Sequence, residues 1–241
     1  SAKARGYSQS VIDRVWSIIE GFGSFGFCKA HGAAFALPTY QSAYLKTHYP
    51  TEFIAGLLTH DPGMYPKRLI VTEARRLGVE LLPIDVNVST KQYRVEKTQS
   101  GSGVRMAITE IAGMSEAEKD RVVAEQPFSD LADFYIRARP SRRTLERLAL
   151  IGALDSVAKI ERSQSIDRRG DLLVAIRQLS AKPAPKQDPN QLGFDFKNIV
   201  SMPVGNPGIS PNEQLDNELS ITGLDLSRHQ LEQFQEMLDE M

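Results

Sequence analysis

Two short connections between predicted helices have the residue types to bind phosphate groups. They are Ile111-Ala112-Gly113-Met114 and Leu150-Ile151-Gly152-Ala153-Leu154. In a helix-hairpin-helix unit, a glycine turn lets backbone N–H groups at the start of a helix approach a phosphate closely. The candidate contact residues are Gly113, Met114, Ser115, Gly152 and Ala153. Neither connection has the full hydrophobic-x-Gly-hydrophobic-Gly pattern, so DNA binding and plain helix-turn packing both remain open.

A cluster of arginines lies beside the second connection. Its members are Arg137, Arg139, Arg142, Arg143 and Arg147, with Glu146 as the one acidic residue among them. Guanidinium groups suit phosphate oxygens, although such runs also occur as solvated helix faces. The net charge of the chain is only −1, so any contact with DNA must come from a local patch. We expect Arg139, Arg142 and Arg143 to belong to that patch.

A peptide with a regular apolar pattern interrupts a proline-rich stretch. It reads Gln191-Leu192-Gly193-Phe194-Asp195-Phe196 and follows the segment Lys182–Asn190. Aromatic residues at alternate positions act as anchors when such a peptide docks into a preformed pocket. The alternative is a linker that folds back onto its own domain. The position after a tether favours a partner, and the contact residues are then Gln191, Leu192, Phe194 and Phe196.

No catalytic or metal-binding pattern is visible in the sequence. The four histidines lack the spacing of metal ligands, and no Asp-x-Asp pair stands in an apolar strand. Lys29 and His31 precede a helix of small residues and could meet a phosphate or nucleotide, but a capping or packing role is also open. We therefore expect no catalytic residue and no metal in this chain.

Bulk properties restrict the class of protein. The single cysteine, Cys28, excludes an internal disulfide and suits a reducing cytoplasm. No run of 18 apolar residues predicts a membrane span. The opening Ser1-Ala2-Lys3-Ala4-Arg5-Gly6 has neither an initiator Met nor a signal peptide, so we expect an internal segment of a longer protein.

The pattern of apolar residues predicts a mainly α fold with a small antiparallel β element. Residues 1–78 read as helices, one of them stopped by Gly21 and Gly23 and another interrupted by Pro38. Residues 79–110 alternate as strands do, and 111–181 are again helical, with a capping box at Ser115 and Glu118. Residues 182–212 form a flexible linker with the peptide, and 213–241 a helical segment that ends in an amphipathic helix near 228–240.

Several stretches resemble the bacterial DNA polymerase III alpha subunits, the C-family DNA polymerases. The segment from Phe25 to Leu37 and that from Tyr40 to Phe53 are similar to a long ungapped pattern in the fingers of that family. The family also has counterparts of Leu82–Ser89, Ile111–Met114, Leu148–Asp155 and Glu218–Ser227. Ala30, Pro38 and Ser227–Gln230 depart from its usual residues, which leaves open whether the chain is closer to the replicative enzyme or to an error-prone paralogue.

The resemblance implies a helical fingers subdomain followed by a tandem helix-hairpin-helix domain that contacts duplex DNA. It implies that Gln191, Leu192, Phe194 and Phe196 bind the sliding clamp, and that Lys29 and His31 lie near the nucleotide site. Primer-template DNA, deoxynucleoside triphosphates and other replisome subunits would be partners of the whole enzyme, with no membrane partner. The magnesium-binding aspartates of the palm and the PHP domain would precede Ser1, and an OB domain would follow Met241. The alternatives are a stand-alone hairpin module of a nuclease or ligase, and an interaction scaffold without a DNA role.

Overall fold

The computed structural model describes residues 2–25, 29–99, 101–181, 202–235 and 237, without the side chains of 22–25. The chain divides into two compact units, Ser1–Tyr49 and Pro50–Met241. The expected boundary at residue 78 thus falls inside the second unit, and the domain assignment stays a prediction.

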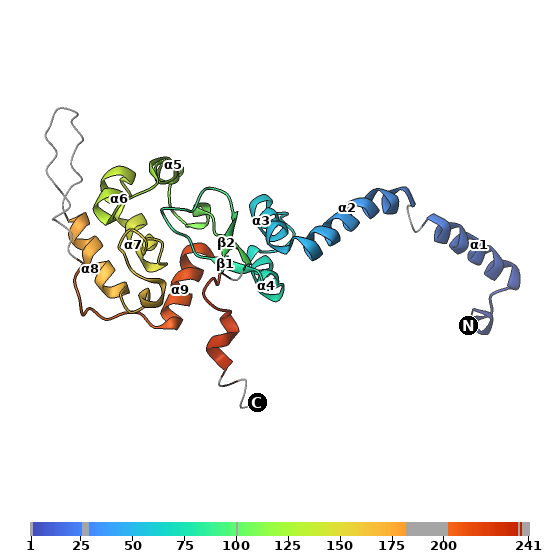
Figure 1. The fold of residues 1–241 in the computed structure, drawn as a ribbon. Coiled ribbons are helices and arrows are strands. Elements are labelled where there is room, and N and C mark those ends of the chain that lie inside the picture. Colours follow the sequence, from blue (N-terminus) through green and yellow to red (C-terminus); the bar gives the residue numbers. More distant parts are fainter. Residues whose placement is uncertain (1, 26–28, 100, 182–201, 236, 238–241) are drawn as a thin grey trace. The chain divides into compact units, whose positions relative to one another are not determined.

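The first unit contains a short 3-10 helix, η1 (Lys3–Arg5), and two α-helices, α1 (Gln9–Phe25) and α2 (Lys29–His48) (Figure 1). Contrary to expectation, α1 runs through Gly21 and Gly23 instead of ending there. Pro38 lies inside α2, and none of the residues of α2 is buried.

In the second unit, two helices pack with a three-stranded sheet. They are α3 (Pro50–His60) and α4 (Lys67–Arg76), and the strands are β1 (Glu80–Leu82), β2 (Arg94–Thr98) and β3 (Gly101–Arg105). The sheet has the order β1-β3-β2. The β2–β3 hairpin is antiparallel, as expected, but β1 pairs with β3 in parallel, so the sheet is mixed. The long connection after β1 is what permits this parallel pairing.

Four helices follow the sheet and build most of the remaining core (Figure 1). They are α5 (Glu116–Glu125), α6 (Leu131–Ala138), α7 (Arg142–Leu150) and α8 (Arg169–Ser180). A 3-10 helix, η2 (Ile108–Glu110), precedes α5, and another, η3 (Arg162–Gln164), lies between α7 and α8. Phe134, Leu145, Leu148 and Leu172 are fully buried where these helices meet. The prediction of a mainly helical fold with a small β element is confirmed.

The segment that leads to the last α-helix is attached to α8. Asn206 donates its backbone N–H to Asp171 Oδ1 over 2.9 Å, and Ile209 donates to the Ile166 carbonyl over 3.1 Å. A Cβ added to Gly208 would stand 2.7 Å from the Ile166 carbonyl oxygen, so only glycine fits this contact. The part of the expected linker that the structure describes is therefore not a free tether.

The chain then forms α9 (Pro211–Thr222) and a 3-10 helix, η5 (Gln230–Phe234). Within the amphipathic α-helix expected at 228–240, residues 230–234 form the 3-10 helix, and residues 235 and 237 are α-helical. Across the described residues, no helix has both the length and the apolar composition needed to cross a membrane.

Candidate nucleic-acid interface

The first of the two glycine connections, residues 111–114, is called the Gly113 turn here. It joins η2 to α5, and Gly113 adopts a positive φ of 73°, a conformation that favours glycine. Ser115 caps α5, and the predicted capping box with Glu118 is confirmed. The turn is thus fixed directly before the N-terminus of a helix, where backbone N–H groups lack helical acceptors.

Three exposed amides at this turn have no acceptor in the described part of the chain. They belong to Gly113, Glu116 and Ala117. Of the other two residues expected in this turn, Met114 is buried and Ser115 donates its amide to Glu118 Oε2 over 3.0 Å. Glu116 and Ala117 were not among the predicted contact residues, although the cap at Ser115 makes them the first two positions of the helix.

Glu118 connects the start of α5 with the start of α7. Its Oε2 accepts the Ser115 hydroxyl over 2.8 Å, and its Oε1 accepts the backbone N–H of Ser141 over 2.7 Å. Burial alone would raise the pKa of the carboxyl, but the backbone N–H groups of Ser141 and Ser115 hold it at about 2. This internal anion therefore joins the N-termini of two helices next to the Gly113 turn.

The members of the arginine cluster differ in exposure and in their partners. Arg139, Arg142 and Arg143 are exposed, and Arg142 pairs with Glu146 over 3.1 Å. No partner is found for the Arg143 side chain within the described ranges. Arg137 instead pairs with Asp133 and Glu125, and Arg147 donates to the Ala112 carbonyl. Residues four apart share a helix face, so Arg143 lies on the side of α7 that reaches the Gly113 turn.

The second connection, residues 150–154, is called the Gly152 turn and has a different hydrogen-bond pattern. Gly152 also has a positive φ, 79°, but its amide donates to the Ala149 carbonyl over 3.1 Å. The amide of Ala153 donates to the Leu148 carbonyl over 2.9 Å. This pattern closes the C-terminus of α7, so neither amide is available to a phosphate. The geometry does not favour the expected DNA contact at Gly152 and Ala153.

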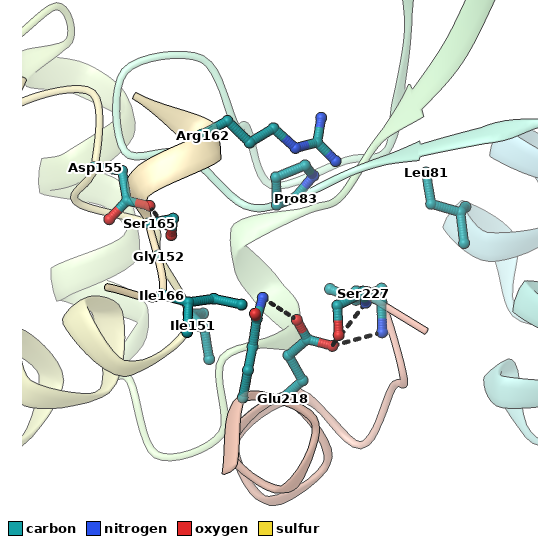
Figure 2. A pocket seen from close by; sticks show the side chains of 12 residues that line it. Leu81, Pro83, Ile151, Gly152, Asp155, Arg162, Ser165, Ile166, Glu218 and Ser227 are labelled. Atoms are coloured by element: carbon teal, nitrogen blue, oxygen red, sulfur yellow. Dashed lines mark hydrogen bonds between the residues drawn. The ribbon is translucent and has the colours of Figure 1, made fainter. Parts of the chain in front are cut away.

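Acidic groups surround the Gly152 turn. The fully buried Arg169 pairs with Asp155 over 2.8 Å, and Gly152, Asp155 and Glu218 line a cavity of about 260 Å³ (Figure 2). Glu218 accepts the backbone N–H of Ser227 over 2.8 Å and that of Leu226 over 2.9 Å. Burial raises the pKa of both carboxyls, but the donors of the chain already occupy them. Arg162 also lines the cavity and pairs with Glu80 over 4.0 Å, so the cavity contains charges of both signs.

The remaining expected site residues lie elsewhere. Lys29 and His31 are exposed at the start of α2, where the His31 ring lies 4.5 Å from that of Phe35. Gln191, Leu192, Phe194 and Phe196 lie outside the described residues. Across the described ranges, no group of three His, Cys, Asp or Glu side chains could hold a metal ion, so these residues do not fit a magnesium site.

Comparison with known proteins links this geometry to a family. A profile for the helix-hairpin-helix motif matches residues 78–165, which include both glycine turns. The chain is 34% identical over 237 residues to an error-prone DNA polymerase of Dechloromonas aromatica, covering 96% of the chain and 21% of that protein. It is 32% identical over 234 residues to that of Rhodopirellula baltica, covering 94% of the chain and 19% of that protein.

The chain is homologous to a segment of the C-family DNA polymerases. A third relative, the error-prone DNA polymerase of Bdellovibrio bacteriovorus, is 42% identical over 156 residues, covering 63% of the chain and 15% of that protein. The chain therefore spans about a fifth or less of the length of these relatives. The similarity to the Dechloromonas and Rhodopirellula proteins extends over nearly all residues of the chain. The matched region therefore includes both compact units.

Proposed function

We propose that the chain is the part of a DNA-directed DNA polymerase that holds primer-template duplex DNA. The observation that carries this proposal is the Gly113 turn, where three amides have no acceptor among the described residues and where Arg147, four residues after Arg143 on α7, contacts Ala112. Backbone amides and arginines bind phosphate oxygens without reading base sequence. The contact would therefore hold the product duplex at any position along the template.

The negative charges near the turn do not oppose this role strongly. Glu116 pairs with Lys119 over 2.7 Å and with Lys91 over 3.2 Å, while Glu118 is buried and bonded on both oxygens. Arg142 and Arg143 follow the cap of α7 directly, where the helix dipole adds positive potential. The local field thus favours an anion although the whole chain has a net charge of −1.

Duplex binding is tested by titrating the chain with fluorescent double-stranded DNA at two salt concentrations. We expect binding that weakens as salt increases and that does not depend on base sequence. The double variant R142A/R143A should bind more weakly, whereas K97A, an exposed change on β2, should not. Equal binding of DNA by the double variant and the wild type would contradict the proposed site.

A second part of the proposal concerns the sliding clamp. The peptide Gln191–Phe196 would dock into the clamp, so that the enzyme stays at the primer end by tethering rather than by high intrinsic affinity. Its support is the pattern of Gln191, Leu192, Phe194 and Phe196 within a proline-rich stretch. The double variant Q191A/F196A should lose clamp binding and keep duplex binding. N190A, next to the peptide, is the matched control.

The two measurements also separate the alternatives. A hairpin module from a nuclease or ligase would bind duplex DNA but not the clamp, and a scaffold without a DNA role would show no salt-dependent binding. The relatives named above are error-prone DNA polymerases, which favours the error-prone paralogue over the replicative enzyme.

The whole enzyme would use deoxynucleoside triphosphates and Mg²⁺, and would work with other replisome subunits in the cytoplasm. Its magnesium would be held outside the described residues, because these contain no suitable group of ligands. Lys29 and His31 would contact the incoming nucleotide or DNA from the first unit. K29A and H31A would then raise the apparent KM for nucleotide in the whole polymerase, with K46A at the other end of α2 as control.

A further inference from the structure

Arg147 lies against the inner side of the Gly113 turn. Its guanidinium donates to the Ala112 carbonyl, and a Cβ built on Gly113 would overlap the same guanidinium. Within the described residues, no carboxylate pairs with Arg147. Although it belongs to the arginine cluster, this side chain is therefore directed at the turn itself.

The bond to Ala112 also determines where the Gly113 amide points. The Ala112 carbonyl and the Gly113 N–H belong to one planar trans peptide group, so they point in opposite directions. When Arg147 holds the carbonyl from the inside, the Gly113 N–H is directed away from Arg147, and it has no acceptor in the described part of the chain. A charged donor on the carbonyl also polarises the peptide group and strengthens its N–H as a donor.

A second bond fixes the preceding peptide group. The Ala112 N–H donates over 2.8 Å to the carbonyl of Ile221, which lies near the C-terminal end of α9. Helix C-termini have carbonyls without helical donors, so this acceptor is available without breaking α9. Arg147 and α9 together prevent rotation of the two peptide groups that precede Gly113.

We propose that Arg147 is a positioning residue for DNA binding: it aims the Gly113 amide at a DNA phosphate and does not contact the phosphate itself. This inference rests on the proposed duplex binding at the Gly113 turn. It assigns different roles to two arginines of the same face of α7, because Arg143 would neutralise a phosphate directly whereas Arg147 would act through a neutral backbone amide.

The salt dependence of binding distinguishes these roles. Each phosphate neutralised by an arginine contributes about 0.9 to the slope of log K against log salt concentration, whereas a neutral amide releases no counterion. The experiment titrates duplex DNA against the wild-type chain, R147M, R147K and R143M over a series of salt concentrations. We expect R147M to weaken binding about tenfold at every salt concentration with an unchanged slope. R147K can still donate to the carbonyl and should restore most of the affinity.

The matched variant R143M should lower the slope by about 0.9. A slope that falls by the same amount in R147M would overturn the inference, because Arg147 would then contact phosphate itself. Unchanged affinity in R147M would also overturn it. If the wild-type chain itself shows no salt-dependent binding, the proposed duplex binding is wrong. That outcome is distinct from the two R147M outcomes, which require wild-type binding to be present.

Thermal melting checks that the variants fold. R147Q keeps a polar side chain at this half-buried position of α7 and replaces R147M if the latter is unfolded. The same comparison of salt slopes then tests the inference. Amide hydrogen exchange at Ala112 gives an independent readout. It should become faster in R147M, because the peptide group beside the Ile221 bond is no longer held, and an unchanged rate would contradict the positioning role.

Discussion

The Gly113 and Gly152 turns are alike in sequence and in backbone conformation, but they differ in whether the glycine amide has a hydrogen-bond acceptor. Both glycines have a positive φ, 73° and 79°. Gly113 precedes the N-terminus of α5, and its amide has no acceptor among the described residues; Gly152 follows the C-terminus of α7, and its amide bonds to α7. A helix start has spare donors and a helix end has spare acceptors, so a glycine turn can bind an anion only on the first side.

The charges around the two turns agree with this difference. Arg143 and Arg147 lie on the face of α7 that meets the Gly113 turn, whereas Asp155 and Glu218 line the cavity beside the Gly152 turn. We infer that the first turn binds DNA and that the second stabilises the fold. Four predictions test this comparison, beginning with the largest effect.

Replacing Asp155 with alanine should destabilise the chain by about 3 kcal/mol. The change leaves the fully buried Arg169 without the carboxylate that pairs with it over 2.8 Å. Urea denaturation measures the free energy of unfolding, and S156A, which loses an exposed hydrogen bond to Asp85, is the control. A stable D155A chain with weakened DNA binding would assign the Gly152 turn to DNA instead.

Replacing Glu118 with glutamine should cost about 2 kcal/mol at pH 7. The pKa of this carboxyl is about 2 in the folded chain, against a usual value of 4.5, so its ionised form stabilises the fold above pH 4.5. This contribution is lost as the pH falls from 4.5 towards 2, where the wild type and E118Q should approach the same stability. Urea denaturation midpoints at several pH values measure this difference in stability between the wild type and E118Q.

The control for that experiment is E116Q, at an exposed position of the same helical turn. It should shift the midpoint less than E118Q does. A difference between E118Q and the wild type that stays constant from pH 7 to pH 2 would show that the ionised Glu118 does not stabilise the joined helix starts.

Alanine at the two glycines should separate DNA binding from stability. Each change costs about 1 kcal/mol for the left-handed backbone conformation. An added Cβ would also meet a guanidinium in both variants, that of Arg147 in G113A and that of Arg169 in G152A. G152A should cost more, because Arg169 is fully buried and cannot move aside, and its Cβ would also stand 3.0 Å from Asp155 Oδ2. G113A should instead weaken duplex binding about tenfold, since one amide contact is displaced.

Gly78 provides the matched control for both glycine variants. It has a φ of 72° and no atom within 4 Å of an added Cβ, so G78A measures the backbone cost alone. Fluorescence anisotropy with duplex DNA and urea denaturation are measured on all three. Loss of DNA affinity in G152A but not in G113A would reverse the assignment of the two turns.

Replacing Arg143 with alanine should have the smallest effect on stability, within about 0.5 kcal/mol, because the side chain is exposed. It should nevertheless lower the salt slope of duplex binding by about 0.9. R76A, which removes an exposed arginine of α4 that pairs with Glu73, is the control. An equal change of slope in both variants would indicate only a general effect of charge.

Some features of the site could be predicted from sequence because they depend on neighbouring residues. The capping box joins Ser115 to Glu118, three positions further along the chain, and the structure contains it. The hydrogen-bond partner of the second Glu118 oxygen could not be predicted in this way, because the donor, Ser141, lies at the start of α7, two helices further along the chain. The parallel pairing of β1 with β3 was missed for the same reason, because strand partners are set by the whole unit.

The sequence by itself determined where the two glycine turns and the start of α5 lie, because backbone conformation and capping depend on residues within a few positions of each other. Only the tertiary structure decided which amides remain without acceptors and which arginines are used internally. Ala112 receives its partners from α7 and α9, and Gly152 is surrounded by Arg169 and Asp155. Hydrogen bonds between distant segments form only when the chain is folded, and they separate two turns that the sequence presents as equivalent.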